Sequence, residues 1–104
     1  MDKYIKENHV GVLYSPGHGS GWYTSNTEYP EILFDPTIVD MLLGGVLTLE
    51  EIGNYAKLKY PDIYLGGIDT LCIFWVKVGE KFIVHEYDGH EEVWISSKID
   101  WFET

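Results

Sequence analysis

The sequence predicts a single α+β domain over residues 1–104, with an antiparallel sheet and two helices packed on one face of it. Three observations lead to this prediction: two segments with readable helix ends, a nearly continuous apolar run at residues 71–78, and the hairpin signal Asp88-Gly89. A chain of 104 residues can bury a core without disulfides or a metal. We expect the sheet to be a C-terminal meander of three strands, extended by an N-terminal strand.

Both predicted helices have capping residues at their starts. The first begins after Asp35, which is followed by a proline at the first helical position, and it ends at Gly44-Gly45. The second begins after Thr48, where Glu51 completes a capping box, and it ends before the proline at position 61.

The strands are predicted from short apolar runs bounded by turn residues. Residues 1–8 read as a frayed end or an edge strand, and residues 22–24 as a short strand after the first loop. The C-terminal tail, residues 97–104, is expected to pack back onto the body. The main predicted strands are His9–Tyr14 and residues 71–78, 81–87 and 90–96.

The two predicted hairpin turns set the register and sort the side chains onto two faces. With Asp88-Gly89 as the turn, the facing pairs are Tyr87 with His90, His85 with Glu92, and Ile83 with Trp94. With Gly79-Glu80 as the turn, they are Val76 with Ile83, Phe74 with His85, and Cys72 with Tyr87. The expected core face is Leu71, Ile73, Trp75, Phe82, Val84, Val93 and Ile95, interrupted by Glu86 and Glu91. The other face gathers Cys72, Phe74, Val76, Ile83, His85, Tyr87, His90, Glu92 and Trp94, which suggests a site or a partner interface.

Charge and composition exclude several classes of function. The chain has 17 acidic and 7 basic residues, a formal net charge of −10, and every basic residue is a lysine. Direct nucleic-acid binding is disfavoured, because it needs a basic surface. No apolar run reaches the length of a membrane span, and the N-terminus lacks a signal-peptide core, so we expect a cytoplasmic protein without membrane contact. The acidity either serves solubility or forms a polyanion-like surface for a basic partner.

The segment Ser15-Pro16-Gly17-His18-Gly19-Ser20-Gly21 is the main candidate site. Glycine at every second position is typical of positive φ or of close approach to the backbone. The segment lacks a Walker lysine, the third glycine of a dinucleotide loop and the glycines of a nucleophile elbow. It is therefore either a tightly packed connection or a loop whose N–H groups hold an anion beside stacking rings. The candidate ligand-binding residues are Ser15, Gly17, His18, Gly19, Ser20, Trp22, Tyr23, His85, Tyr87 and His90.

The four histidines raise the question of metal binding and catalysis. No H-E-x-x-H or Cys/His spacing is present, so we predict no metal site, no cofactor and no catalytic residue. Acid–base chemistry by His85 or His90 with Glu86 or Glu92 stays open as an alternative.

Four segments together resemble a family of small uncharacterised proteins encoded by tailed bacteriophages. The resemblance spans most of the chain, but it brings no established activity and so assigns no site residue. It implies an accessory protein made in the cytoplasm of an infected bacterium, acting against host defence by occupying a host protein or sequestering a signalling nucleotide. The segments are Gly11-Val12-Leu13-Tyr14-Ser15-Pro16-Gly17 with Gly21-Trp22, Leu33-Phe34-Asp35-Pro36, Tyr64-Leu65-Gly66-Gly67, and Glu86-Tyr87-Asp88-Gly89.

From these features we expect a non-enzymatic binding module that holds a small nucleotide-like ligand through the glycine-rich loop and the aromatic and histidine face. The first alternative is an acidic inhibitor that mimics a polyanion and docks on a basic host defence protein. The second is a small His-dependent hydrolase. Whether the chain forms a homo-oligomer is open.

Overall fold

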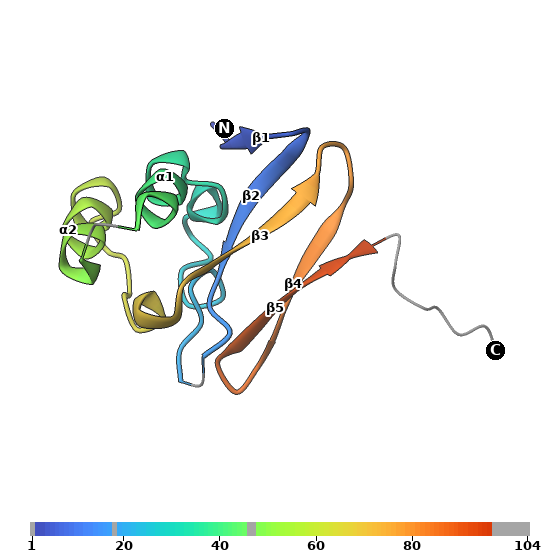
Figure 1. Ribbon diagram of the computed structural model, residues 1–104. Coiled ribbons are helices and arrows are strands. Elements are labelled where there is room, and N and C mark those ends of the chain that lie inside the picture. Colours follow the sequence, from blue (N-terminus) through green and yellow to red (C-terminus); the bar gives the residue numbers. More distant parts are fainter. Residues whose placement is uncertain (1, 18, 46–47, 97–104) are drawn as a thin grey trace.

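A computed structural model describes residues 2–17, 19–45 and 48–96 (Figure 1). Within these residues the chain forms two α-helices and five strands in two antiparallel sheets, which confirms the α+β class. The helices lie on one side of the first sheet and the second sheet lies on the other. The elements are β1 (Ile5–Lys6), β2 (His9–Tyr14), a 3-10 turn (Pro30–Leu33), α1 (Pro36–Gly44), α2 (Leu49–Lys59), a 3-10 turn (Ile68–Thr70), β3 (Cys72–Lys77), β4 (Phe82–Tyr87) and β5 (His90–Ile95).

The predicted helix ends are confirmed. Asp35 caps α1 by accepting hydrogen bonds from the N–H groups of the second and third helical residues, and Gly45 ends the helix with φ +66°. The Thr48 hydroxyl accepts a bond from Glu51 N at 3.3 Å at the start of α2. Neither helix, nor any other in the described part of the chain, is long and apolar enough to cross a membrane.

The predicted single sheet is wrong. The first sheet has the order β1-β2-β3, so β3 pairs along its length with β2, and β4 pairs with β5 in a separate sheet. β1 is the edge strand, as one reading of the N-terminus expected. The facing pairs drawn across Gly79-Glu80 (Val76 with Ile83, Phe74 with His85, Cys72 with Tyr87) therefore do not form.

A local and a global cause explain this correction. Glu80 N bonds to Lys77 O and Gly79 has φ +91°, so the turn is centred on Val78 and Gly79, a type II pattern that splays its strands. In addition, β3 has apolar side chains on both faces, so each face must be covered by another element. The helices cover one face, and the β4–β5 hairpin folds across the other (Figure 1).

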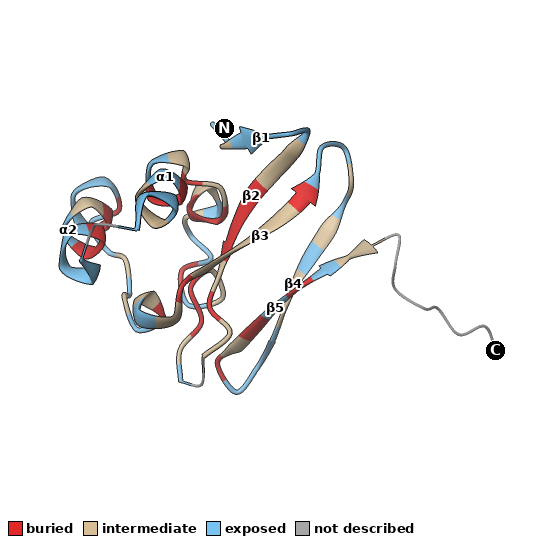
Figure 2. Cartoon of the chain, in the orientation of Figure 1, coloured by how far each residue is buried: buried red, intermediate tan, exposed pale blue. Residues whose placement is uncertain are grey.

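The core accordingly has two parts (Figure 2). Helix residues such as Ile38, Val39 and Ile52 pack with Leu13 and Trp22 on one side of the first sheet. The second part lies between the two sheets. The predicted core face is thus divided: Leu71, Ile73 and Trp75 belong to the helix side, whereas Phe82, Val84, Val93 and Ile95 pack against Val12, Phe74 and Val76.

The register of the β4–β5 hairpin is confirmed. The pairs Tyr87–His90, His85–Glu92 and Ile83–Trp94 all form, and both turn residues have positive φ, +51° at Asp88 and +84° at Gly89. Residues 22–24 are turns and bends, so the short strand predicted there is wrong. The expectation for residues 97–104 lies outside the described residues.

Candidate functional site

The glycine-rich loop is held by a buried carboxylate from β5. Glu91 is fully buried, and its Oε1 accepts a hydrogen bond from Ser15 N at 2.8 Å. Its Oε2 accepts bonds from Thr24 N and from the Thr24 hydroxyl, at 2.8 and 2.9 Å. Glu91 N in turn donates to Ser15 O. One side chain thus connects the start of the loop and the turn that follows the loop to the hairpin, and three donors offset the cost of burying its charge.

The loop glycines are explained by close packing. A Cβ at Gly17 would collide with the Thr70 side chain, and a Cβ at Gly21 would collide with Thr24 and Glu91. Gly19 has φ +124°, a conformation that other residues rarely adopt, and its carbonyl lies against Gly89 at the tip of the hairpin. Packing and backbone conformation therefore account for glycine at all three positions without any ligand.

Two of the remaining loop candidates, Ser15 and Trp22, are buried. Trp22 is fully buried and donates from Nε1 to Ile32 O at 3.1 Å, so the expectation that its ring offers a stacking face is wrong. The Ser15 hydroxyl is hydrogen-bonded to Thr70, and the Ser20 hydroxyl donates to the Tyr64 hydroxyl at 3.3 Å. Tyr23 is half-buried against both parts of the core, and His18 lies outside the described residues.

The other candidates gather on the outward side of the β4–β5 hairpin. We call this surface the outer hairpin face, and it is mostly exposed: Tyr87 is 77% exposed, Ile83 49% and Trp94 36%. The opposite side of the same strands is packed on the first sheet, which holds the hairpin in place. The residues of the outer hairpin face are Ile83, His85, Tyr87, His90, Glu92 and Trp94.

Three rings of this face, His85, His90 and Trp94, are already ordered by their neighbours. His85 stacks on Trp94 with centroids 4.2 Å apart and planes within 10°. Trp94 Nε1 donates to Glu92 Oε2 at 2.8 Å, and this bond, aided by His90 and His85, lowers the pKa of the Glu92 carboxyl. His90 Nε2 lies 3.2 Å from Glu92 Oε1, while its Nδ1 bonds to Pro16 O. The face is therefore pre-organised, and His90 connects it to the glycine-rich loop.

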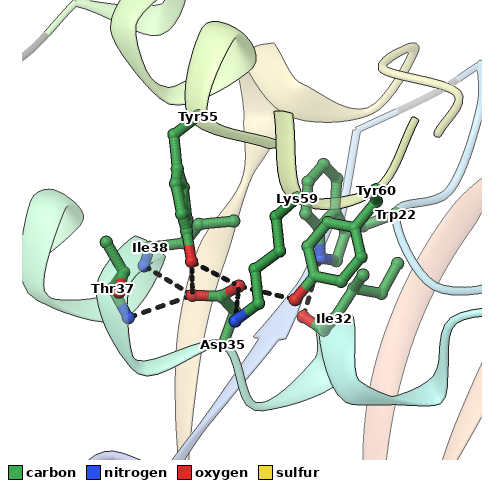
Figure 3. Close-up of polar contacts among 8 residues, drawn as sticks. All are labelled: Trp22, Ile32, Asp35, Thr37, Ile38, Tyr55, Lys59 and Tyr60. Atoms are coloured by element: carbon green, nitrogen blue, oxygen red, sulfur yellow. Dashed lines mark hydrogen bonds and ion pairs between the residues drawn. The ribbon is translucent and has the colours of Figure 1, made fainter. Parts of the chain in front are cut away.

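A second buried carboxylate lies on the helix side (Figure 3). Asp35 accepts hydrogen bonds from the Tyr60 hydroxyl at 2.6 Å and the Tyr55 hydroxyl at 3.1 Å, and Lys59 Nζ lies 3.3 Å away. Burial, and then the bond to Asp35, raise the pKa of Tyr60. The pKa of Lys59 is also raised, because its hydrogen bond with Tyr55 and the charge of Asp35 outweigh the opposing effect of desolvation. This cluster clamps the start of α1 to the end of α2.

Sequence reasoning missed these two carboxylate centres in different ways. Glu91 did leave a signal, because it interrupts the predicted core face, and a carboxylate on such a face needs several donors. Asp35 was predicted only as a helix cap. Tyr55 and Lys59, four residues apart on one helix face, were the available signal for a shared polar partner.

Metal chemistry finds no support in the described residues, where no group of three His, Cys, Asp or Glu side chains is suited to hold an ion. The chain matches no protein-family model, and searches of curated proteins and of solved structures find no match.

Proposed function

We propose that the protein is a non-enzymatic protein-binding module whose outer hairpin face docks on a basic partner. The observation that supports this most is an exposed set of rings, three of them ordered by their neighbours, on a hairpin whose other side is packed in the core. Exposed apolar surface is typical of interaction sites, and Trp and Tyr are enriched among the residues that dominate binding energy. Ordered rings lose little side-chain entropy when a partner covers them.

The geometry favours this alternative over a small nucleotide-like ligand. The backbone of the glycine-rich loop packs closely against Thr70, Glu91 and Gly89. Trp22 is buried in the core, so its ring is not exposed to a ligand. The His85 and Trp94 rings are stacked on each other, so His85 occupies one side of the indole. No specific observation on the described residues favours the His-dependent hydrolase.

The charge of the chain favours a basic partner. A net charge of −10 repels phosphate-bearing ligands at long range and attracts a basic protein surface. Acidic residues also lie at the rim of the rings, with Glu92 on the face and Asp88 in the turn at its end. The resemblance to phage accessory proteins makes a host defence protein the natural candidate, in the cytoplasm of an infected bacterium.

Affinity capture with matched variants tests the proposal. Tyr87→Ala removes the most exposed ring of the outer hairpin face, and Leu58→Ala removes an 86% exposed side chain on α2. We expect the wild type and Leu58→Ala to capture the same basic protein from bacterial lysate, and Tyr87→Ala to capture at least about tenfold less. Melting curves establish that all three proteins are folded.

Mass spectrometry of the same eluates identifies any small molecule bound to the protein. A nucleotide released from the wild type, with no protein captured, would favour the small-ligand function. Equal capture by Tyr87→Ala and wild type would contradict docking on the outer hairpin face.

A further inference from the structure

A hollow of about 310 Å³ lies where the β1–β2 turn meets the C-terminal end of α1. Its volume is at the lower end of the range for small-molecule sites. Its residues come from β1, the following turn, β2, α1 and β3, so it shares none with the outer hairpin face. The lining residues are Lys6, Glu7, His9, Leu43 and Trp75.

Strand pairing fixes the aromatic wall of this hollow. Trp75 pairs with Gly11, and a Cβ at Gly11 would lie 3.2 Å from the Trp75 ring, so the ring rests directly over the glycine. The Tyr4 ring packs against Trp75 with centroids 6.1 Å apart, and Gly11 N donates to Tyr4 O at 3.0 Å. The indole is therefore in place before any ligand arrives, which lowers the cost of binding.

The turn that forms another side of the hollow is also ordered. Glu7 and Asn8 have φ +52° and +65°, the left-handed pair of a tight hairpin turn. His9 Nδ1 lies 2.8 Å from Glu7 O, so a ring protonated at Nδ1 donates to this carbonyl and supports the turn.

The end of α1 beside the hollow favours a cation. The last turn of α1 contains no basic residue, so its own side chains do not offset the partial negative charge of the C-terminal carbonyls beside Leu43. In the lining, Glu7 contributes a carboxylate and Lys6 a cation; outside it, Asp40 lies one turn before Leu43 and the exposed Lys77 pairs with His9 across the sheet. The face of an indole ring attracts cations, and a chain of net charge −10 steers them inward.

We infer that this hollow binds a small organic cation, an ammonium group carried on a short apolar stem. The ammonium lies near Glu7 and the carbonyls that end α1, and the stem packs on Leu43 and Trp75. This site is independent of the partner proposed for the outer hairpin face, so either can fail without the other.

An amide NMR titration of the full chain tests the inference with three probes of similar shape. They are 2-phenylethylammonium, 2-phenylethanol and 3-phenylpropanoate, which carry a positive, a zero and a negative charge. We expect saturable shifts at the Trp75 indole N–H and at the Lys6 and Leu43 amides. The ammonium should bind at least about threefold tighter than the alcohol, and the carboxylate weakest.

Two neighbouring variants give the matched control, since Glu7 and Lys6 are both exposed. Glu7→Gln should weaken ammonium binding about two- to fivefold, and Lys6→Gln should strengthen it by a similar factor. Tightest binding of the carboxylate, equal binding of all three probes, the reverse response of the variants, or no shift at these residues up to about 10 mM probe would each overturn the inference.

Discussion

Two buried carboxylates, Glu91 and Asp35, organise this protein at the scale of single residues. Both are essentially inaccessible to solvent, and each is surrounded by donors from segments distant in the sequence. Asp35 also has a cation beside it, the half-exposed Lys59, at 3.3 Å. Because an unsatisfied buried charge is costly, removing a single donor or altering either carboxylate should affect stability measurably.

Glu91→Gln is the direct test of the loop attachment. The amide keeps one oxygen acceptor but places an NH₂ group against the donors of Ser15 or Thr24. We expect the free energy of unfolding in urea to fall by about 1–3 kcal/mol. The neighbouring exposed variant Glu92→Gln should be close to wild type, and equal effects of the two variants would contradict the proposed attachment.

Tyr60→Phe tests the clamp on the helix side through its pH dependence. The variant leaves Asp35 without a 2.6 Å donor, so unfolding at pH 7 should cost about 1–3 kcal/mol less than in wild type. The folded-state pKa of Tyr60 is raised, so its contribution is complete below the ordinary tyrosine value of about 10 and is lost as pH rises above it.

Stability measured between pH 9 and 11.5 should therefore fall more steeply in wild type than in Tyr60→Phe. The difference in slope is at most about 1.4 kcal/mol per pH unit for one proton. Parallel pH profiles would show that Tyr60 does not titrate differently on folding.

At the scale of elements, local signals were readable from the sequence and long-range pairings were not. The starts of α1 and α2 and the register of the β4–β5 hairpin depend on residues within a few positions, such as Asp35, Thr48 and Asp88-Gly89. Whether β3 pairs with β2 or with β4 depends on how both apolar faces of β3 become covered. That is a property of the assembled layers and not of any turn.

In the candidate site, too, local features could be predicted from the sequence and long-range contacts could not. The glycines of the loop were recognised, but what they pack against was not, because Thr70 and Glu91 lie roughly fifty to seventy residues later in the chain. The outer hairpin face was found because its residues alternate along β4 and β5 around a recognisable turn, as in the pairs Tyr87–His90 and Ile83–Trp94.

Gly89→Ala tests the attachment of the hairpin tip to the loop, with Gly79→Ala as its control. Both glycines have similar positive φ, +84° and +91°, so both variants carry a backbone cost of about 1–2 kcal/mol. Only at Gly89 would the new methyl group collide with the Gly19 carbonyl, while Gly79 has open space. We expect Gly89→Ala to lower the free energy of unfolding by at least about 1 kcal/mol more. Equal losses would show that the tip is not held against the loop.

At the scale of the whole molecule, the described chain forms three layers: the helices, the first sheet and the β4–β5 hairpin. The helices and the first sheet enclose one part of the core, the two sheets enclose the other, and the outer hairpin face is left facing solvent (Figure 2). The net charge of −10 acts over this whole surface. Charge should therefore govern how fast a basic partner arrives, and the rings should govern how long it stays.

The salt dependence of the two binding rates separates the contribution of charge from that of the rings. Raising ionic strength from about 0.05 to 0.5 M shortens the Debye length and should slow association with the captured partner by at least about tenfold. Dissociation should change little, because ring contacts are not screened. Surface plasmon resonance across this range measures both rates, and a salt-independent association rate would argue against a basic partner.

Site-specific photo-crosslinking determines whether a partner binds on the outer hairpin face. A photoreactive benzoylphenylalanine replaces Tyr87, or, as the control, Leu58, which is 86% exposed on α2, on the other side of the first sheet. Irradiation in bacteria that produce either protein should yield a crosslinked basic protein from position 87 and not from position 58. Crosslinks from position 58 alone, or the same product from both positions, would contradict docking on the outer hairpin face.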